Sequence, residues 1–320
     1  MKHLATLAIL CGLAAPAAAQ ETVTFAWTPN PQTPQVDVAL AEGHFEDAGL
    51  DVQLVSFPSG REGFEALLGG QVDIAFMAEF PAVVGALRDQ DFAIVADLAR
   101  YTGSRIIGSA EAGPLETPAD LAGKRIGTTR GTNVDYFLSG VLEKAGVEAE
   151  IVNASPVDLV SALSRGDVDA IVPFPTFYAA AEEALGEDYL ELRVGDYQPH
   201  FILTATPEMV EDRSEVLEAF LGALAEADAQ VAQAPEAAMD AVTTSMQGAM
   251  STQALATMWE DVDLGLKLDD GLRDLLVSEG AWIVDQGVIN AEAPTAQSLA
   301  DHFRGDALSE VAPDAVRLTK

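Results

Sequence analysis

Two short stretches of the sequence carry residue types that bind anions. Ser59-Gly60-Arg61 opens an expected helix, and Arg130-Gly131-Thr132-Asn133 precedes another. Backbone N–H groups at a helix start attract negative charge, an arginine adds a full positive charge, and a glycine lets the backbone approach a ligand closely. The alternative is structural, because serine, threonine and asparagine cap helices with or without a ligand. Both stretches are therefore candidate halves of an anion site.

Two further segments could reach the same ligand. The loop "TPNPQ" (28–32) follows an expected strand, and its Asn30 and Gln32 can donate or accept hydrogen bonds. An ordinary proline-rich turn is the other interpretation of this loop. Tyr101 lies near an expected connection between the two halves of the chain, where it could contact the ligand or lie on the surface.

Apolar and acidic side chains follow two other expected strands, in "FMAEF" (76–80) and "VPFPTF" (172–177). Met77, Glu79 and Phe174 are expected to line a cleft there, where an aromatic ring can stack on a flat ligand or enclose an aliphatic one. Glu79 would bind an amino group of the ligand or cap the next helix. Phe80 and Phe177 are assigned to the core.

These loops are positioned by a unit that the chain contains twice. "GGQVDIAF" (69–76) returns about 96 residues later as "RGDVDAIV" (165–172). Each closes a strand-helix-strand-helix-strand pattern, the first from "VTFAW" (23–27) and the second from "KRIGTT" (124–129). The first helix of each unit is expected to end at a glycine, Gly49 and Gly146, and Val-Asp recurs near each first helix.

Strands that alternate with helices predict an α/β protein with mostly parallel sheets covered on both faces. Ligands bind such sheets at the carboxyl ends of the strands, so two facing lobes would share one cleft. We expect lobe 1 to span 20–101, lobe 2 to span 102–202, and 203–320 to complete lobe 1 with C-terminal helices. The chain would cross between lobes at about 98–105 and 195–203.

Composition excludes several function classes. The formal charge is −34, with 51 acidic and 17 basic residues, and this argues against nucleic acid or an anionic membrane as partner. G-x-S-x-G and H-E-x-x-H are absent, and His44, His200 and His302 show no paired spacing. We therefore expect no catalytic residue, no metal and no cofactor.

The first residues, MKHLATLAILCGLAAPAAAQ, have the pattern of a cleavable secretory signal peptide over 1–19. A basic start precedes an apolar run too short to span a membrane, and Ala17-Ala18-Ala19 suits cleavage before Gln20. Cys11 is the single cysteine, and Leu10 before it is too large for a lipoprotein signal. We expect a periplasmic chain with neither a lipid anchor nor a thiol.

Several segments together resemble one family: "ALAEGHFEDAGLDV" (39–52), "SGREGFEALLGGQVDIAF" (59–76), "DLAGKRIGTTRGTNVDYFLSGVLEKAGV" (120–147), "ALSRGDVDAIVPFPTF" (162–177) and "EGAWIVDQGVI" (279–289). The chain is similar to the periplasmic substrate-binding proteins of ABC importers of the nitrate, sulfonate and taurine class. This class shares a domain type with thiamine-pyrimidine precursor binding and synthesis proteins.

The resemblance implies a two-lobed periplasmic-binding-protein clamshell (type II) that closes on one small solute and presents it to ABC permease subunits, as a monomer. A small organic anion such as a sulfonate, taurine or nitrate is the expected solute. A thiamine-type pyrimidine is the alternative, and it would move the site toward Trp27, Glu79 and Phe174. An enzyme of the pyrimidine-synthesis branch and a solute receptor that signals are further alternatives. The chain departs from relatives with tryptophan before the second-lobe proline, because it has Pro173-Phe174-Pro175 there.

Overall fold

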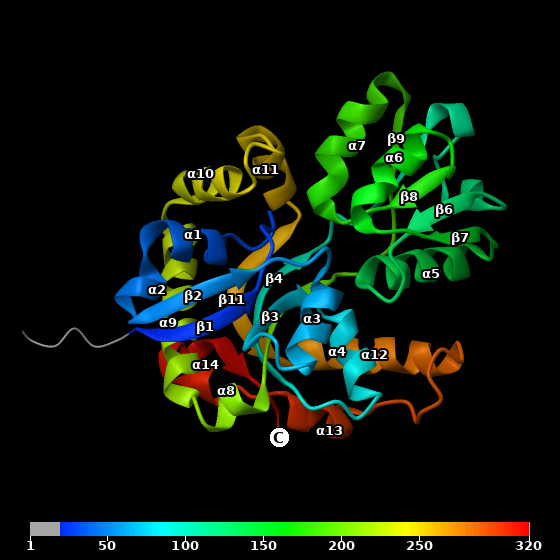
Figure 1. Cartoon of the computed structure of the whole chain (residues 1–320). Coiled ribbons are helices and arrows are strands. Elements are labelled where there is room, and N and C mark those ends of the chain that lie inside the picture. Colours follow the sequence, from blue (N-terminus) through cyan, green and yellow to red (C-terminus); the bar gives the residue numbers. More distant parts are fainter. Residues whose placement is uncertain (1–19, 320) are drawn as a thin grey trace, which may run out of the picture.

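The computed structural model describes residues 20–319, so the expected signal peptide and Cys11 lie outside the described residues. Two β-sheets form two lobes (Figure 1). The larger sheet has seven strands in the order β12-β11-β4-β10-β3-β1-β2. Its strands are β1 (Glu21–Ala26), β2 (Leu50–Val55), β3 (Ile74–Ala78), β4 (Ala93–Tyr101), β10 (His200–Ala205), β11 (Val262–Asp269) and β12 (Val316–Arg317).

The second sheet has five strands in the order β7-β6-β8-β5-β9. They are β5 (Arg105–Ser109), β6 (Arg125–Thr128), β7 (Glu150–Asn153), β8 (Ala170–Val172) and β9 (Tyr189–Arg193). The chain passes from the first sheet to the second after β4 and returns after β9, so residues 102–104 and 194–199 connect the lobes.

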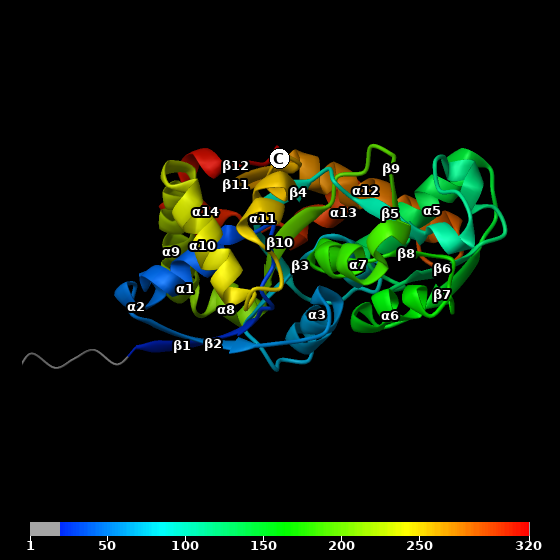
Figure 2. The same ribbon diagram turned by 90° about the horizontal axis from the view of Figure 1, so that it is seen from above.

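Helices cover both faces of each sheet. Those of the larger lobe are α1 (Pro34–Glu42), α2 (His44–Asp47), α3 (Gly60–Leu68), α4 (Phe80–Ala86), α8 (Pro207–Glu211), α9 (Ser214–Gln233), α10 (Pro235–Ser245), α11 (Thr252–Trp259), α12 (Asp270–Asp285), α13 (Ala296–Leu299) and α14 (Asp306–Val311). Those of the smaller lobe are α5 (Asn133–Ala145), α6 (Leu159–Ser164) and α7 (Tyr178–Leu185). α1, α9 and α14 pack together on one side of the large sheet, and α3, α4 and α12 cover the other (Figures 1 and 2).

The two-lobed α/β architecture is confirmed, but the expectation of mostly parallel sheets is wrong. β1 is parallel to β2 and β3, and β6 is parallel to β7 and β8, as the repeated unit predicts. The strands next to the connections, β4, β5, β9 and β10, are antiparallel to their partners. Of these four, β5 and β10 run against the parallel strands of their sheets, because each is the first strand after the chain crosses to the other lobe and does not follow a β-α-β crossover.

The expected helix end at Gly49 is also wrong, since the helix already stops at Gly43. Gly43 adopts φ 78°, a left-handed conformation that favours glycine, and a separate short helix, α2, follows. Gly146 does end α5, with φ 66°. Residues 203–320 form the expected C-terminal helices and also two strands of the large sheet, β11 and β12.

The aspartates of the repeated pairs Val72-Asp73 and Val168-Asp169 make equivalent hydrogen bonds in the two sheets. The Asp73 carboxylate accepts the backbone N–H of Thr24 in β1 at 2.7 Å, and its own N–H donates to the Thr24 carbonyl at 2.9 Å. Asp169 makes the equivalent pair of bonds to Arg125 in β6, both 2.8 Å long. Each aspartate therefore ties the start of its unit's third strand to the first strand.

Candidate functional site

A cavity of about 140 Å³ opens between the two lobes. The large lobe lines it with segments that follow β1 and β2, with the start of α3, with the end of β3, and with Pro81 and Phe201. The small lobe lines it with the start of α5 and with the segment after β8. The lining residues are Ala26, Trp27, Thr28, Pro29, Asn30, Phe57, Pro58, Ser59, Gly60, Arg61, Gly63, Phe76, Met77, Ala78, Pro81, Thr132, Asn133, Phe174, Pro175, Thr176, Phe177 and Phe201.

The start of α3 forms one polar edge of the cavity. The Ser59 hydroxyl caps the helix by accepting the N–H of Glu62 at 3.4 Å, and it donates to the Glu62 carboxylate at 3.2 Å. Gly60 is required for packing, because a Cβ there would lie 2.7 Å from the Cα of Met77 in β3. The helix start is thus held against β3, with its first N–H groups free of intrahelical acceptors.

Arg61 extends from this helix start to the opposite lobe. Its Cδ lies 3.7 Å from the position that a Cβ of Gly131 would occupy. Its Nη1 donates to Glu65, one turn along α3, at 2.9 Å. Its Nε is buried and has no acceptor within residues 20–319. A buried N–H without an acceptor is costly, so an anion that accepted from this group would offset that cost.

The start of α5 forms the facing polar edge. Thr132 precedes the helix but does not cap it, because its hydroxyl donates to the Thr129 carbonyl at 2.7 Å. Thr132 and Asn133 are both buried and both line the cavity. Asp135, in the same first turn, accepts the N–H of Gly131 at 3.0 Å and does not line the cavity. The uncapped helix start leaves N–H groups for a ligand.

Six aromatic side chains also line the cavity: Trp27, Phe57, Phe76, Phe174, Phe177 and Phe201. The rings of Trp27 and Phe76 pack edge to face with centroids 4.6 Å apart, and Phe76 stacks on Phe201 at 6.1 Å. Asn30 lies beside them with its orientation fixed, since its Oδ1 accepts the N–H of Gln32 at 2.8 Å. The Asn30 amide N–H groups thus remain as donors.

Arg61 is the one charged residue in the lining among the described residues. This is unexpected by composition, because the whole chain has 51 acidic and 17 basic residues. The acidic groups of the first turns of α3 and α5 bond back to their own loops. The lining thus contains one positive side chain, which is paired with Glu65 outside the lining, and local donors determine what binds there because solvent screens the distant charges.

The structure brings together nine of the expected site residues: Trp27, Asn30, Ser59, Gly60, Arg61, Met77, Thr132, Asn133 and Phe174. The other five, Gln32, Glu79, Tyr101, Arg130 and Gly131, lie outside the lining. Arg130 is exposed. Gly131 has φ 74°, so the loop needs glycine for its conformation.

Gln32 and Tyr101 are both wholly buried. The side-chain amide of Gln32 has no hydrogen-bond partner in the described part of the chain. The Tyr101 hydroxyl donates to the Gly103 carbonyl at 2.9 Å, within the first connection between the lobes. Tyr101 thus lies neither on the surface nor in the cavity.

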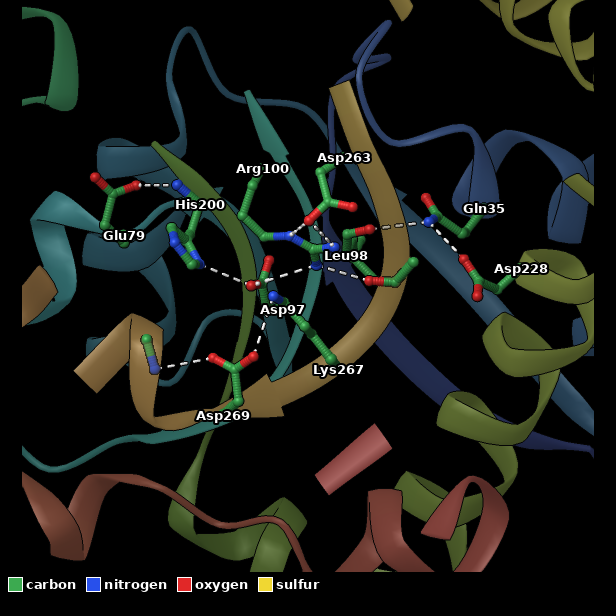
Figure 3. A network of polar contacts seen from close by, with 12 residues as sticks. Gln35, Glu79, Asp97, Leu98, Arg100, His200, Asp228, Asp263, Lys267 and Asp269 are labelled. Atoms are coloured by element: carbon green, nitrogen blue, oxygen red, sulfur yellow. Dashed lines mark hydrogen bonds and ion pairs between the residues drawn. The ribbon is translucent and has the colours of Figure 1, made fainter. Parts of the chain in front are cut away.

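Glu79 belongs to a buried polar network, part of which Figure 3 shows, and it does not line the cavity. Its carboxylate accepts the backbone N–H of His200 at 2.8 Å and the hydroxyl of Tyr197. His200 Nδ1 lies 2.7 Å from the carboxylate of Asp97, which also pairs with Arg100 at 3.5 Å. Burial raises the pKa of Glu79 and of Asp97. Glu79 therefore connects β3 to the returning chain and lies outside the cavity lining.

Sequence reasoning missed four of the aromatic residues. Phe57 follows β2, so the argument that located the other strand ends would have found it. Phe177 was assigned to the core, although it lines the cavity. Phe76 lies within β3 and Phe201 within β10, and both line the cavity. Because neither residue is in a loop that follows a strand, the sequence pattern does not mark them as site residues.

Within residues 20–319, the structure contains no helix long and apolar enough to cross a membrane. The same residues include no cluster of three or more histidine, cysteine, aspartate or glutamate side chains arranged to hold a metal ion.

A family model described as "NMT1/THI5 like" matches residues 30–238, more than half of the chain. The chain belongs to the NMT1/THI5-like family. The match includes both helix starts and the cavity aromatics other than Trp27, and it begins just after the first strand of the first repeated unit. The resemblance drawn from the sequence is therefore confirmed.

The individual relatives of this NMT1/THI5-like chain have low sequence identity to it. A putative aliphatic sulfonates-binding protein of Escherichia coli (strain K12) is 25% identical over 181 residues, which cover 56% of this chain and 57% of that protein. A formylaminopyrimidine-binding protein of Halalkalibacterium halodurans is 24% identical over 231 residues, 70% of this chain and 69% of that protein. The alignments thus span little more than half to two thirds of these relatives.

Solved structures share the fold. The periplasmic aliphatic sulphonate binding protein SsuA of Escherichia coli has a TM-score of 0.71 at 18% identity, covering 87% of this chain and 97% of that one. The desulfurization enzyme DszB has a TM-score of 0.68 at 16% identity, covering 92% and 99%. Binding proteins and an enzyme occur on this fold, so the contents of the cavity must distinguish them.

Proposed function

We propose that this protein is an extracytoplasmic solute-binding protein that captures a small organic anion between its lobes and delivers it to the permease of an ABC importer. The observation that carries the proposal is the cavity itself. Both lobes contribute to it, and its one charged side chain within the described chain is Arg61. Relatives named for sulfonate and taurine binding support this function, and the signal-like first residues support a periplasmic location.

The lining favours binding over catalysis. Acyl or proton transfer needs a nucleophile or base within hydrogen-bond reach of another catalytic group. The hydroxyls of Ser59, Thr28 and Thr132 donate to Glu62, to the Phe57 carbonyl and to the Thr129 carbonyl. Neither a histidine nor a carboxylate lines the cavity among the described residues. The polar groups present can hold and orient an anion.

Closure of the lobes would follow from differential affinity. A solute that touches α3 in one lobe and α5 in the other stabilises the closed arrangement over the open one. The two connections, 102–104 and 194–199, are the segments about which the lobes would move. The closed form would then be the one that the permease receives.

A thiamine-type pyrimidine is the second candidate. The six aromatic rings of the wall and the formylaminopyrimidine-binding relative favour it. It predicts binding that depends on stacking against Trp27 and that is insensitive to the loss of Arg61.

The test compares two arginine variants by isothermal titration calorimetry with ethanesulfonate, with nitrate and a formylaminopyrimidine as additional ligands. The protein would start at Gln20 and be unfolded and refolded to remove carried ligand. Arg61→Ala should weaken ethanesulfonate binding by about tenfold or more, because it removes a charged hydrogen-bond donor. Arg130→Ala is the matched control, since it removes the same charge from an exposed position outside the cavity. Equal effects of the two variants, or binding of the pyrimidine alone, contradict the proposal.

A further inference from the structure

The cavity offers a charged donor for the head of an anion but no charged acceptor for an amine. Not one acidic side chain lines it in the part of the chain that the structure describes, although the protein has 51 of them. An ammonium group taken from water needs a counter-charge or several acceptors, and without them its transfer is strongly unfavourable. Arg61 and the positive ends of α3 and α5 would also repel it.

Glu79 is the carboxylate that the sequence offered for this task, and the structure commits it elsewhere. It is wholly buried outside the lining. Its oxygens accept the N–H of His200 and the hydroxyl of Tyr197, as Figure 3 shows for His200. Turning it toward the cavity would leave that N–H unpaired in the protein interior, which costs free energy.

The neutral side-chain acceptors of the lining supply no counter-charge for an ammonium, and some of them are already occupied. Asn30 Oδ1 is occupied by the N–H of Gln32 and the hydroxyl of Thr33. Ser59 Oγ is occupied by the N–H of Glu62. The side-chain acceptors that remain are the hydroxyls of Thr28, Thr132 and Thr176 and the amide of Asn133, and none of them carries a charge. Thr132 and Asn133 lie at the start of α5, where the anionic head is expected.

The wall away from these donors is aromatic on both sides. Trp27, Phe57, Phe76 and Phe201 come from the large lobe, and Phe174 and Phe177 come from the small lobe. Closing the lobes would bring a ligand tail between the two sets of rings. Aromatic rings stabilise one another through offset or edge-to-face contacts beyond the effect of buried area.

We propose, on the basis of the function proposed above, that the solute is an anion with an aromatic or bulky apolar tail and without an amino group. This excludes zwitterions such as taurine, and amino-substituted pyrimidines, as the preferred ligands. Arg61 and the two helix starts bind the head, the six rings enclose the tail, and the absence of acidic groups rejects amines.

Calorimetry on the refolded protein with three sulfonates, ethanesulfonate, taurine and benzenesulfonate, tests this inference. Taurine and benzenesulfonate each differ from ethanesulfonate in a single feature. Taurine is ethanesulfonate with an added ammonium, and benzenesulfonate replaces the ethyl tail by a ring. Benzenesulfonate should bind about tenfold or more tightly than ethanesulfonate, and taurine about tenfold or more weakly, given the area that the ring buries and the uncompensated charge of the amine.

Two variants locate the tail. Phe174→Leu and Phe177→Leu should each weaken benzenesulfonate by about threefold or more and leave ethanesulfonate within about twofold, because only the ring reaches these side chains. Unchanged thermal melting without ligand would confirm that each variant is folded. Taurine binding as tightly as ethanesulfonate, or a benzenesulfonate affinity no higher than that of ethanesulfonate, overturns the inference while the proposed anion site stands. If none of the three sulfonates binds, the proposed function fails and this inference fails with it.

Discussion

Glu279 on α12 should make the stability of this protein fall as the pH rises. The side chain is wholly buried, and its Oε1 accepts the Tyr197 hydroxyl at 3.4 Å. Its Oε2 has no hydrogen-bond partner among residues 20–319. Burial and the neighbouring Glu79 raise the pKa of Glu279 well above its usual range. The folded protein therefore keeps a proton on this pair that the unfolded chain releases.

The sign follows from proton linkage. A carboxyl whose pKa is raised in the folded state is unpenalised below its unfolded pKa, near 4, and loses stability as the pH rises toward its folded pKa. One extra proton in the folded state changes the free energy of unfolding by about −1.4 kcal/mol per pH unit in this window. Glu279 should thus remove stability at up to this rate from about pH 4 upward, until the pH passes its raised folded pKa.

Urea unfolding of Glu279→Gln and the wild type at several pH values measures this. The variant should be more stable than the wild type, by a margin that grows by about 1 kcal/mol or more per pH unit. Asp274→Asn is the matched control, because Asp274 is exposed on the same helix and the change removes the same charge. Parallel stability curves for Glu279→Gln and the wild type would refute the reasoning, since they require a Glu279 that ionises equally in both states.

Two further predictions concern the scaffold. Gly60→Ala should lower the free energy of unfolding by about 2 kcal/mol, because the new Cβ would lie 2.7 Å from the backbone of β3. Gly140→Ala on α5 should raise the free energy of unfolding by about 0.5–1 kcal/mol, because the added Cβ would meet nothing within 4 Å and alanine favours a helix. Urea titration of both variants measures these opposite changes. Asp169→Ala should lower it by about 2 kcal/mol through the lost bond to the Arg125 N–H. The exposed neighbour Asp167, changed to alanine, should cost less than about 0.5 kcal/mol, and an equal loss in both would contradict the strand-tying role.

The sequence predicts those parts of the fold that depend on local signals. The β-α-β pattern, the cap at Ser59 and the end of α5 at Gly146 all follow from residues within a few positions of the element concerned. The candidate site follows from the same signals wherever a strand or helix of the repeated unit ends at the cleft. Trp27, Ser59, Thr132 and their neighbours in the lining are of this kind.

Contacts between segments that are far apart in the sequence could not be predicted from local sequence patterns. Phe201 reaches the cavity because β10 returns antiparallel between β3 and β4, about 120 residues after them in the chain. The same return gives Glu79 its partners, His200 and Tyr197, outside the cavity lining. A glutamate after a strand looks the same in the sequence whether it faces a cleft or a returning chain.

The duplication explains why the two lobes hold the ligand unequally. The residues that recur in both units, Val72-Asp73 and Val168-Asp169, hold strands together and do not line the cavity. Gly70 and Gly166 come two residues before these pairs and have positive φ angles of 66° and 72°. In each unit the glycine lies where the chain turns from the helix toward the third strand. The lining comes from positions where the units differ: the large lobe places Arg61 after its capping serine, and the small lobe places Phe174 after its third strand. The repeated scaffold thus fixes the geometry of the cleft. The residues that differ between the units give the large lobe its charged side chain, and they give the small lobe an uncapped helix start and apolar side chains.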